Sequence, residues 1–292
     1  MISIAMTTYN GEKYLCEQLD SILNQTYKDF ELIICDDSST DKTVQIITSY
    51  KDSRIKLFIN EKNLGFKKNF EKAIKLCTGD HIALSDQDDI WEKDHLKILY
   101  DNINNANLIC GNNLLINAEG ISTGIDFFNS HLLNTKFYNS NYKIFLKILF
   151  SGGCFQGASM LMTKNFAHKY IPIPENIQAH DLWFSTIALL TESFVCTSKI
   201  VTKYRQHDLQ ITKKKNAIGT QRIILLNELT KIITLCENDI FDFLLYFTNI
   251  KSFFGRIKVS KLWYRFYFYI YPDRKKSKFF IRFIKFIFNI RI

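Results

Sequence analysis

The sequence contains no Cys-X-X-Cys pair, and its seven cysteines lie far apart along the chain. An odd number of widely spaced cysteines argues against both a disulfide framework and a zinc site. We therefore expect reduced, mostly buried thiols in a cytosolic protein.

Two kinds of hydrophobic segment are also missing. The opening residues, MISIAMTTYNGEKY, have no basic stretch and become polar by Thr7, so we expect no signal peptide. No window of about 18 residues is apolar enough for a membrane-spanning helix. The composition, with 47% hydrophobic and 23% charged residues, is typical of a folded globular protein.

Two glycine-rich nucleotide motifs are absent as well. The chain has neither a GxxxxGK[ST] phosphate-binding loop nor a GxGxxG dinucleotide fingerprint. Their absence weakens interpretations as a P-loop kinase or as a dehydrogenase.

Charge is distributed unevenly in this chain, whose formal net charge is +9. Residues 251–292 hold 12 Lys and Arg side chains, one acidic residue and 14 of the 42 aromatic residues. Residues 1–250 are nearly neutral, and no known nucleic-acid motif occurs, so nucleic-acid binding is the weaker explanation of the basic pI. The sequence indicates a near-neutral body followed by a basic, aromatic tail.

Short apolar runs alternate with stretches of helical periodicity in the first part of the body. The expected strands are 2–6, 31–35, 55–59 and 81–84, and the expected helices are 11–25, a short one after Asp41, and 66–77. This alternation predicts an α/β fold with a doubly wound, mostly parallel sheet.

Polar clusters follow each expected strand. They are Thr7 to Asn10, Asp36-Asp37, Asn63 to Gly65, and Asp86 to Asp89. Ligands of open α/β sheets bind at the carboxyl ends of the strands, where all four clusters should meet. Ordinary turn preferences explain any one cluster, but they explain poorly an acidic trio followed by Ile90-Trp91.

The stretch ALSDQDDIW concentrates three carboxylates, of Asp86, Asp88 and Asp89, within four residues. A divalent cation would neutralise them, and oxygen ligands select Mg²⁺ or Mn²⁺ with positions left open for phosphates. Asp86 and Asp88 point to opposite sides of an extended segment, so one can face the metal and the other a sugar hydroxyl.

The other clusters suit a nucleotide. Tyr9 can stack on a base, and Asp37 can accept a hydrogen bond from a ring N–H. Lys67 and Lys68 could approach a diphosphate as point charges.

Taken together, ISIAMTTYNGEKYLCEQLDSILNQTYKDFELIICDDSSTD, NLGFKKNFEKAI and SDQDDIW resemble the family 2 glycosyltransferases of bacteria, which have the GT-A fold. The resemblance covers residues 1–210 in order. It implies a nucleotide-sugar site that comprises Thr7, Tyr9, Asn10, Asp37, Asn63, Lys68 and Asp86. Asp86 and Asp88 match the ends of the DxD motif, with Asp88 as the metal ligand, and Lys68 stands where many members have arginine.

Downstream motifs extend the resemblance to the acceptor side. GGCFQGASM resembles the acceptor-side loop, and AHDLWF places Asp181 where the family has its catalytic base. His180 and the YRQH motif resemble the rhamnosyltransferase-like branch, which implies that His207 contacts the metal or the diphosphate. Gln210 departs from that branch's asparagine and is assigned no role. A helix N-cap role for Asp181 and a purely structural role for His207 remain open.

The resemblance implies an inverting, metal-dependent transferase. The donor would be a UDP-sugar or dTDP-rhamnose, and the acceptor a glycan or lipid-linked molecule in bacterial capsule, O-antigen or lipooligosaccharide synthesis. A metal would neutralise the leaving diphosphate, while one base would take the acceptor proton. The alternative is a catalytically degenerate glycan-binding or membrane scaffold protein of the same fold.

The expected domains are a GT-A domain, 1–212, and a helical extension, 213–292. Within the first, 1–105 binds the nucleotide sugar and 106–212 the acceptor. The tail should bind anionic lipid at the inner face of the cell membrane, because basic residues flank an apolar face. Packing on the body or a homo-oligomer contact is the alternative use of its aromatic residues.

Overall fold

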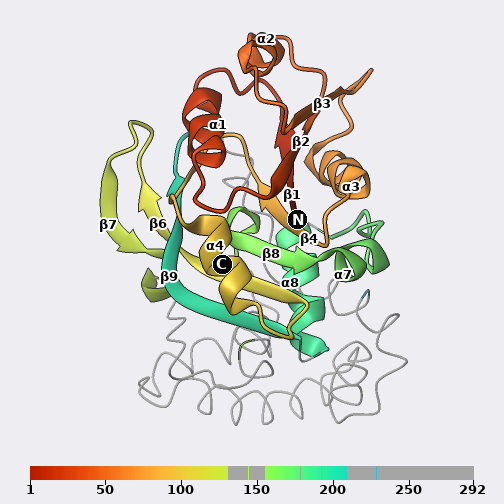
Figure 1. Ribbon diagram of the computed structural model, residues 1–292, viewed down its shortest axis with the longest axis vertical. Coiled ribbons are helices and arrows are strands. Elements are labelled where there is room, and N and C mark those ends of the chain that lie inside the picture. Colours follow the sequence, from red (N-terminus) through yellow and green to blue (C-terminus); the bar gives the residue numbers. More distant parts are fainter. Residues whose placement is uncertain (131–143, 145–154, 178, 192, 209–227, 229–292) are drawn as a thin grey trace, which may run out of the picture. The chain divides into compact units, whose positions relative to one another are not determined.

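The computed structural model describes residues 1–130, 144, 155–177, 179–191, 193–208 and 228 (Figure 1). The chain forms two compact units, Met1–Phe145 with Gly153–Lys215 and Leu146–Gly152 with Asn216–Ile292. The helices predicted in the tail lie outside the described residues. Among the helices that are described, none combines the length and apolar character needed to cross a bilayer.

The first half of the sheet is fully parallel. Strand β1 pairs with β2 on one side and with β4 on the other, and β2 pairs with β3. The bounds are Ile2–Thr8 for β1, Phe30–Asp36 for β2, Ile55–Ile59 for β3 and His81–Ser85 for β4. The order β3-β2-β1-β4 confirms the doubly wound arrangement expected from the sequence.

The second half of the sheet mixes directions. Strand β8 is antiparallel to both β4 and β6, whereas β6 and β9 are parallel, and β5 and β7 add antiparallel pairs. The bounds are Ile90–Trp91 for β5, Leu108–Ile116 for β6, Ser122–Asp126 for β7, Met160–Thr163 for β8 and Phe194–Arg205 for β9. The long β9 therefore carries the chain back toward the edge where β4 ends.

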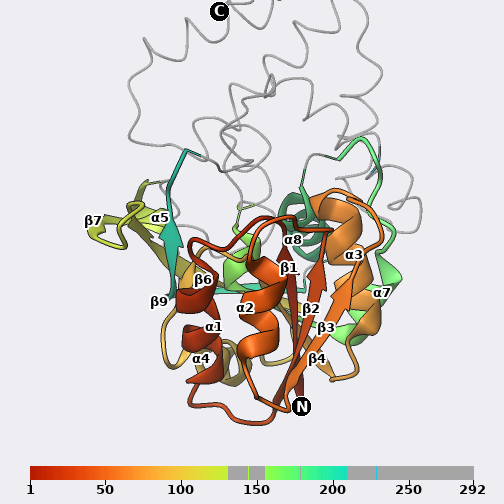
Figure 2. The ribbon, with the colours of Figure 1, turned by 90° about the horizontal axis from the view of Figure 1, so that it is seen from above.

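Helices cover both faces of the parallel half, with α1 and α3 on opposite sides of β1 and β2 (Figures 1 and 2). Helices α4, α7 and α8 pack against strands of the second half of the sheet. The bounds are Leu15–Leu23 for α1, Thr43–Ser49 for α2, Phe66–Leu76 for α3, His95–Asn102 for α4, Phe127–Ser130 for α5, Lys164–Lys169 for α7 and His180–Leu190 for α8. A 3₁₀ turn, η1, spans Gly157–Ser159.

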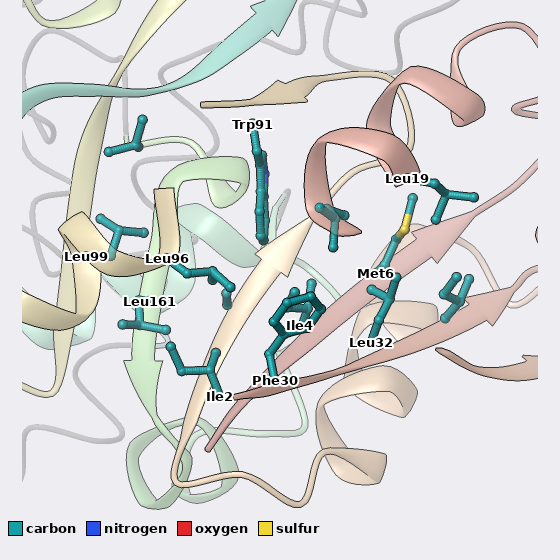
Figure 3. Packing of buried hydrophobic residues seen from close by; sticks show 14 of the residues in the cluster. Ile2, Ile4, Met6, Leu19, Phe30, Leu32, Trp91, Leu96, Leu99 and Leu161 are labelled. Atoms are coloured by element: carbon teal, nitrogen blue, oxygen red, sulfur yellow. The ribbon is translucent and has the colours of Figure 1, made fainter. Parts of the chain in front are cut away.

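Strand periodicity explains how the core is filled. Ile2, Ile4 and Met6 alternate along β1 and pack against Leu19 of α1, in a cluster that also includes Trp91 (Figure 3). Each of these side chains is at most 3% exposed. Burying one such side chain stabilises the fold by about 1.5–3 kcal/mol. This core holds the carboxyl ends of β1, β2 and β4 in place.

Candidate active site

The carboxyl ends of β1 and β2 are joined by side-chain and backbone hydrogen bonds. Oγ1 of Thr8 donates to Oδ1 of Asp36 at 2.8 Å, and the Asp37 N–H donates to the Thr8 carbonyl at 2.8 Å. Met6 of β1 stands beside Ser85 of β4 in the parallel register. The loops after these three strands, including Thr7, therefore meet at one edge of the sheet.

The carboxylate of Asp37 organises the loop that follows β3. It is 2% exposed and accepts hydrogen bonds from Asn60 Nδ2 at 2.8 Å and from the N–H groups of Leu64 and Gly65 at 2.7 and 2.9 Å. Nδ2 of Asn63 donates to the Asp37 carbonyl at 3.3 Å. Asp37 thus brings the Asn63 cluster to the end of β2, and a nucleotide base would share its carboxylate with these donors.

Tyr9 presents its ring to solvent at the end of β1, with 47% of the residue exposed. The side chain of Gln87 pairs with its backbone, accepting from the Tyr9 N–H at 2.8 Å and donating to its carbonyl at 3.0 Å. A methyl group on Gly11 would lie 2.2 Å from Gln87 Oε1, so this approach requires glycine. Oδ1 of Asn10 accepts from the Thr40 N–H at 2.8 Å. Gln87 consequently ties the acidic loop to the loop that carries Tyr9.

The acidic loop holds carboxylates in a poorly solvated environment. Burial, together with the charges of Asp88 and Asp181, raises the pKa of Asp86 far above its usual range. Burial also raises the pKa of Asp89, whose Oδ1 accepts from the Arg205 N–H at 2.9 Å. Oδ2 of Asp89 has no hydrogen-bond partner among the described residues. A bound cation would relieve this accumulation of negative charge.

Asp88 and His207 lie in contact although they are far apart in the sequence. Nε2 of His207 lies 2.7 Å from Oδ2 of Asp88, and the His207 ring packs on Tyr14 with 4.9 Å between centroids. Within the described ranges, no group of three or more His, Cys, Asp or Glu side chains forms a metal site. A Mg²⁺ or Mn²⁺ site completed by substrate phosphates needs only one or two protein carboxylates, which the acidic loop can supply. Nε2 of His207 and Oδ2 of Asp88 face each other, so both atoms could bind one ion only after this contact opens.

Arg205 fixes the acidic loop from the end of β9. Its guanidinium donates to the carbonyls of Asp88 and Ala118 at 2.8 and 3.0 Å and to Glu17 Oε2 at 2.7 Å. It also lies 4.5 Å from the centroid of the Tyr14 ring. The residue is 1% exposed, which suits a structural support for the acidic loop.

Asp181 lies in the first turn of α8, where Ala179 occupies the N-cap position. The N-cap alternative for Asp181 is therefore wrong. Oδ1 of Asp181 accepts from the Leu182 N–H at 2.6 Å, and the Gly157 N–H also hydrogen-bonds this carboxylate. Burial raises the pKa of Asp181 to about 6, which suits a general base operating near neutrality.

The two lysines of α3 differ in their surroundings. Nζ of Lys67 donates to the carbonyls of Glu175 and Ile177, both at 2.6 Å, so its charge is already committed to this loop. Nζ of Lys68 lies 3.4 Å from the Glu175 carboxylate, and its side chain is 61% exposed. Only Lys68 retains the exposure that a diphosphate contact needs.

Several residues of this region had no distinct sequence signal. Gly11, Glu17, Gln87, Gly157 and Arg205 all lie within the quoted motifs, but they act through tertiary contacts that the motifs do not reveal. Gly152 to Cys154 of the acceptor-side motif, together with residues 209–227 and 229–292, lie outside the described residues.

The chain is similar both to a family model and to individual proteins of known sequence. The model of the family described as "Glycosyl transferase family 2" matches residues 3–166. The Escherichia coli UDP-Glc:alpha-D-GlcNAc-diphosphoundecaprenol beta-1,3-glucosyltransferase WfgD is 37% identical over 123 residues, 41% of this chain and 49% of that protein. An uncharacterized Haemophilus influenzae glycosyltransferase is 29% identical over 89% of this chain and 98% of its own length. The chain thus matches about half the length of the E. coli relative.

Solved structures show the same fold. S. aureus TarS 1–349 in complex with UDP-GlcNAc aligns with a TM-score of 0.63 and 20% identity, covering 85% of this chain and 70% of that chain. The mannosyltransferase PcManGT from Pyrobaculum calidifontis, in complex with GDP-Man and Mn²⁺, aligns with a TM-score of 0.55 and 16% identity, covering 87% and 71%. These similarities confirm the predicted GT-A fold.

Proposed function

The chain belongs to glycosyl transferase family 2, and we propose that it transfers a sugar from a nucleoside diphosphate sugar to a hydroxyl group of a glycan or lipid-linked acceptor in bacterial polysaccharide synthesis. One observation carries the proposal. Strand β9 joins the acidic loop to the η1 turn: the Arg205 N–H donates to Asp89 Oδ1 at 2.9 Å, and Thr202 Oγ1 donates to the Ala158 carbonyl at 2.9 Å. The charge of Asp181 also contributes to the raised pKa of Asp86, which supports a single site for the acidic loop and the candidate base.

The donor half of the site comprises Thr7, Tyr9, Asn10, Asp37, Asn63, Lys68 and Asp86. The exposed Tyr9 ring suits base stacking, and the exposed Lys68 ammonium suits a diphosphate. The TarS complex with UDP-GlcNAc and the UDP-Glc-dependent E. coli relative support a UDP-sugar. dTDP-rhamnose is the other donor that the sequence motifs favour.

Asp88 and His207 would hold a divalent cation, Mn²⁺ or Mg²⁺. Their 2.7 Å contact brings a carboxylate and an imidazole together next to the carboxylates of Asp86 and Asp89. The Mn²⁺ in the PcManGT complex supports a divalent cation as the cofactor. When bound, the ion supplies positive charge for the leaving diphosphate.

Asp181 would act as the catalytic base. The backbone N–H groups of Leu182, Gly157 and Asp181 itself orient its carboxylate, and its pKa of about 6 leaves it ionised at neutral pH. It would take the proton from the acceptor hydroxyl as that oxygen attacks the anomeric carbon and the nucleoside diphosphate leaves. A single displacement of this kind inverts the anomeric configuration.

We further propose that the basic, aromatic tail places the enzyme on the cytosolic face of an anionic membrane. The name of the E. coli relative specifies an undecaprenol-linked acceptor, which resides in a bilayer. The 12 basic residues of 251–292 would attract acidic headgroups. This placement would bring the site to a lipid-linked acceptor.

The direct test is a panel of UDP-glucose, UDP-galactose, UDP-N-acetylglucosamine and dTDP-rhamnose. Each is incubated with the protein, Mn²⁺ and a synthetic GlcNAc-diphospho-lipid, and nucleotide release and glycosylated lipid are both measured. One donor should yield both products in a metal-dependent manner. Binding of donor or glycan without turnover of any panel member would favour the alternative of a degenerate binding or scaffold protein.

A further inference from the structure

His180 is buried with both ring nitrogens lacking a hydrogen-bond partner among the described residues. It is 6% exposed, and its ring packs on Phe70 of α3 with 4.0 Å between centroids. Burial lowers the pKa of His180 to about 3, so the ring is neutral at physiological pH. An unpaired buried polar group costs about 1–3 kcal/mol, so the placement of this ring calls for a compensating role.

The ring is in close contact with the η1 turn at Gly157. A methyl group added to Gly157 would lie 2.5 Å from Nε2 of His180, a distance that side-chain carbons do not reach. The backbone of Gly157 has no positive φ, so glycine is needed here for space. The imidazole of His180 and the bare Cα of Gly157 therefore fit each other.

This contact lies beside the carboxylate of Asp181. The N–H of Gly157 hydrogen-bonds that carboxylate, and the N–H of Leu182 donates to its Oδ1 at 2.6 Å. The N–H of Asp181 itself is a third donor, so two donors belong to α8 and one, that of Gly157, belongs to η1. The η1 donor stays in place only while the turn remains packed against the start of the helix.

Helix α3 supports the ring from the other side. Besides the Phe70 contact, Oε1 of Glu71 accepts from the Ile173 N–H at 2.7 Å, and Lys67 binds the carbonyls of Glu175 and Ile177. The loop that leads into α8 is thus held on α3 by both charged and aromatic side chains. Contacts with α3 therefore fix the position of the His180 ring independently of its contact with Gly157.

We propose that His180 is a positioning residue, a wedge between α3 and the η1 turn that keeps the Gly157 N–H on the Asp181 carboxylate. The inference rests on the proposed function of Asp181 as the catalytic base. A hydrogen bond from an N–H group favours the ionised carboxylate, so its loss would leave Asp181 protonated to higher pH. The other titratable groups that influence or adjoin Asp181 are Asp86, Cys110 and His180.

Three variants test the wedge: His180→Ala, Gly157→Ala and the double variant. The assay is the pH dependence of kcat with the panel donor that gives most product, at saturating Mn²⁺. Each single change should move the acidic limb upward by about one pH unit, which lowers kcat about tenfold below the limb. The KM for the donor should change less than about twofold. In the His180→Ala background, Gly157→Ala should have little further effect, because the colliding ring is gone.

His81→Ala is the control. His81 is a half-buried histidine at the amino end of β4, the opposite end of that strand from the acidic loop. Burial lowers its pKa, and its ring packs edge-on against Tyr100 with 5.3 Å between centroids. This variant should lose stability without moving the acidic limb. His180→Asn replaces His180→Ala if the latter does not fold, because the shorter amide cannot reach Gly157.

An acidic limb that stays at the wild-type pH in the folded His180 and Gly157 variants would overturn the inference. Fully additive effects of the two changes would overturn it as well. The Asp181→Asn variant separates this failure from failure of the proposed function. If Asp181→Asn still turned over, Asp181 would not be the catalytic base. If Asp181→Asn were inactive but the acidic limb of the His180 variants did not shift, only the proposed role of His180 would be refuted.

Discussion

Nε2 of His207 lies 2.7 Å from Oδ2 of Asp88, across a sequence separation of 119 residues. The strand pair β5–β9 creates this contact, because it sets Ile90 beside Lys203 just before the chain reaches Arg205 and His207. The guanidinium of Arg205 then secures the Asp88 carbonyl at 2.8 Å. The end of β9 and the loop after β4 therefore form one structural unit.

Replacing Asp88 with asparagine should lower turnover more than about 100-fold with Mn²⁺ supplied, because a charged ligand is lost. The fold should be retained, since fewer negative charges then repel one another in this loop. Steady-state kinetics and a thermal melt check both parts. The same change at Asp101, an exposed residue paired with Lys97, should leave turnover unaffected. Near-normal turnover of Asp88→Asn would remove the proposed metal role.

The acidic limb of the wild-type pH profile should lie near pH 6. Burial raises the pKa of Asp181 to about 6, and the protonated carboxyl cannot accept the acceptor proton. kcat should therefore fall about tenfold for each pH unit below this value. Turnover that persists unchanged down to pH 4 would show that another group serves as the base.

The parallel half of the fold was predictable from sequence because its strands are short and mostly apolar, although Lys56 interrupts β3. Ile2–Met6 and Ile82–Leu84 are buried on both faces, so their boundaries coincide with changes of polarity. The second half was less predictable. Strand β9 is interrupted by polar and charged residues along its exposed parts, and its pairing with β6 depends on contacts distant in sequence.

The same distinction holds within the site. Asp37, Asp88 and Asp181 were recognisable because they occur in motifs at strand or helix ends. The pairing of Gln87 with the Tyr9 backbone and the fit of Gly157 to His180 depend on three-dimensional approach. Lys67 illustrates the limit: its charge suggested a diphosphate contact, but its ammonium binds the carbonyls of a neighbouring loop.

Glu31 should make the stability of the protein depend on acid pH. Hydrogen bonds from Lys56, Ser3 and Thr78 overcome burial and lower the pKa of Glu31 to about 2. A lowered carboxyl pKa contributes stability above the unfolded value of about 4.3, and this contribution is lost as the pH falls toward 2. Glu31→Gln should therefore cost roughly 2 kcal/mol at pH 7 and much less near pH 2.

Urea unfolding at several pH values measures this difference. The exposed Glu61→Gln serves as the control and should follow the wild-type protein at every pH. An equal loss of stability for Glu31→Gln at pH 7 and pH 2 would assign the effect to packing in place of charge.

The tail should bind anionic vesicles through its basic residues. Changing Lys278, Arg282, Lys285 and Arg291 to glutamine should weaken binding to phosphatidylglycerol vesicles by about 4 kcal/mol, at about 1 kcal/mol for each charge. Sedimentation with the vesicles measures the affinity, and high salt should release the wild-type protein. Equal binding by both proteins would leave the tail as a packing or oligomerisation element.

The central claim, base-assisted glycosyl transfer by Asp181, is tested most directly by single-turnover transfer with Asp181→Asn and the wild-type protein. The change keeps the size of the side chain but removes its ability to accept a proton. We predict that transfer to the acceptor falls by about 10² to 10⁴, while donor affinity measured by calorimetry stays the same. Wild-type transfer rates in the variant, or a loss confined to donor affinity, would contradict the account.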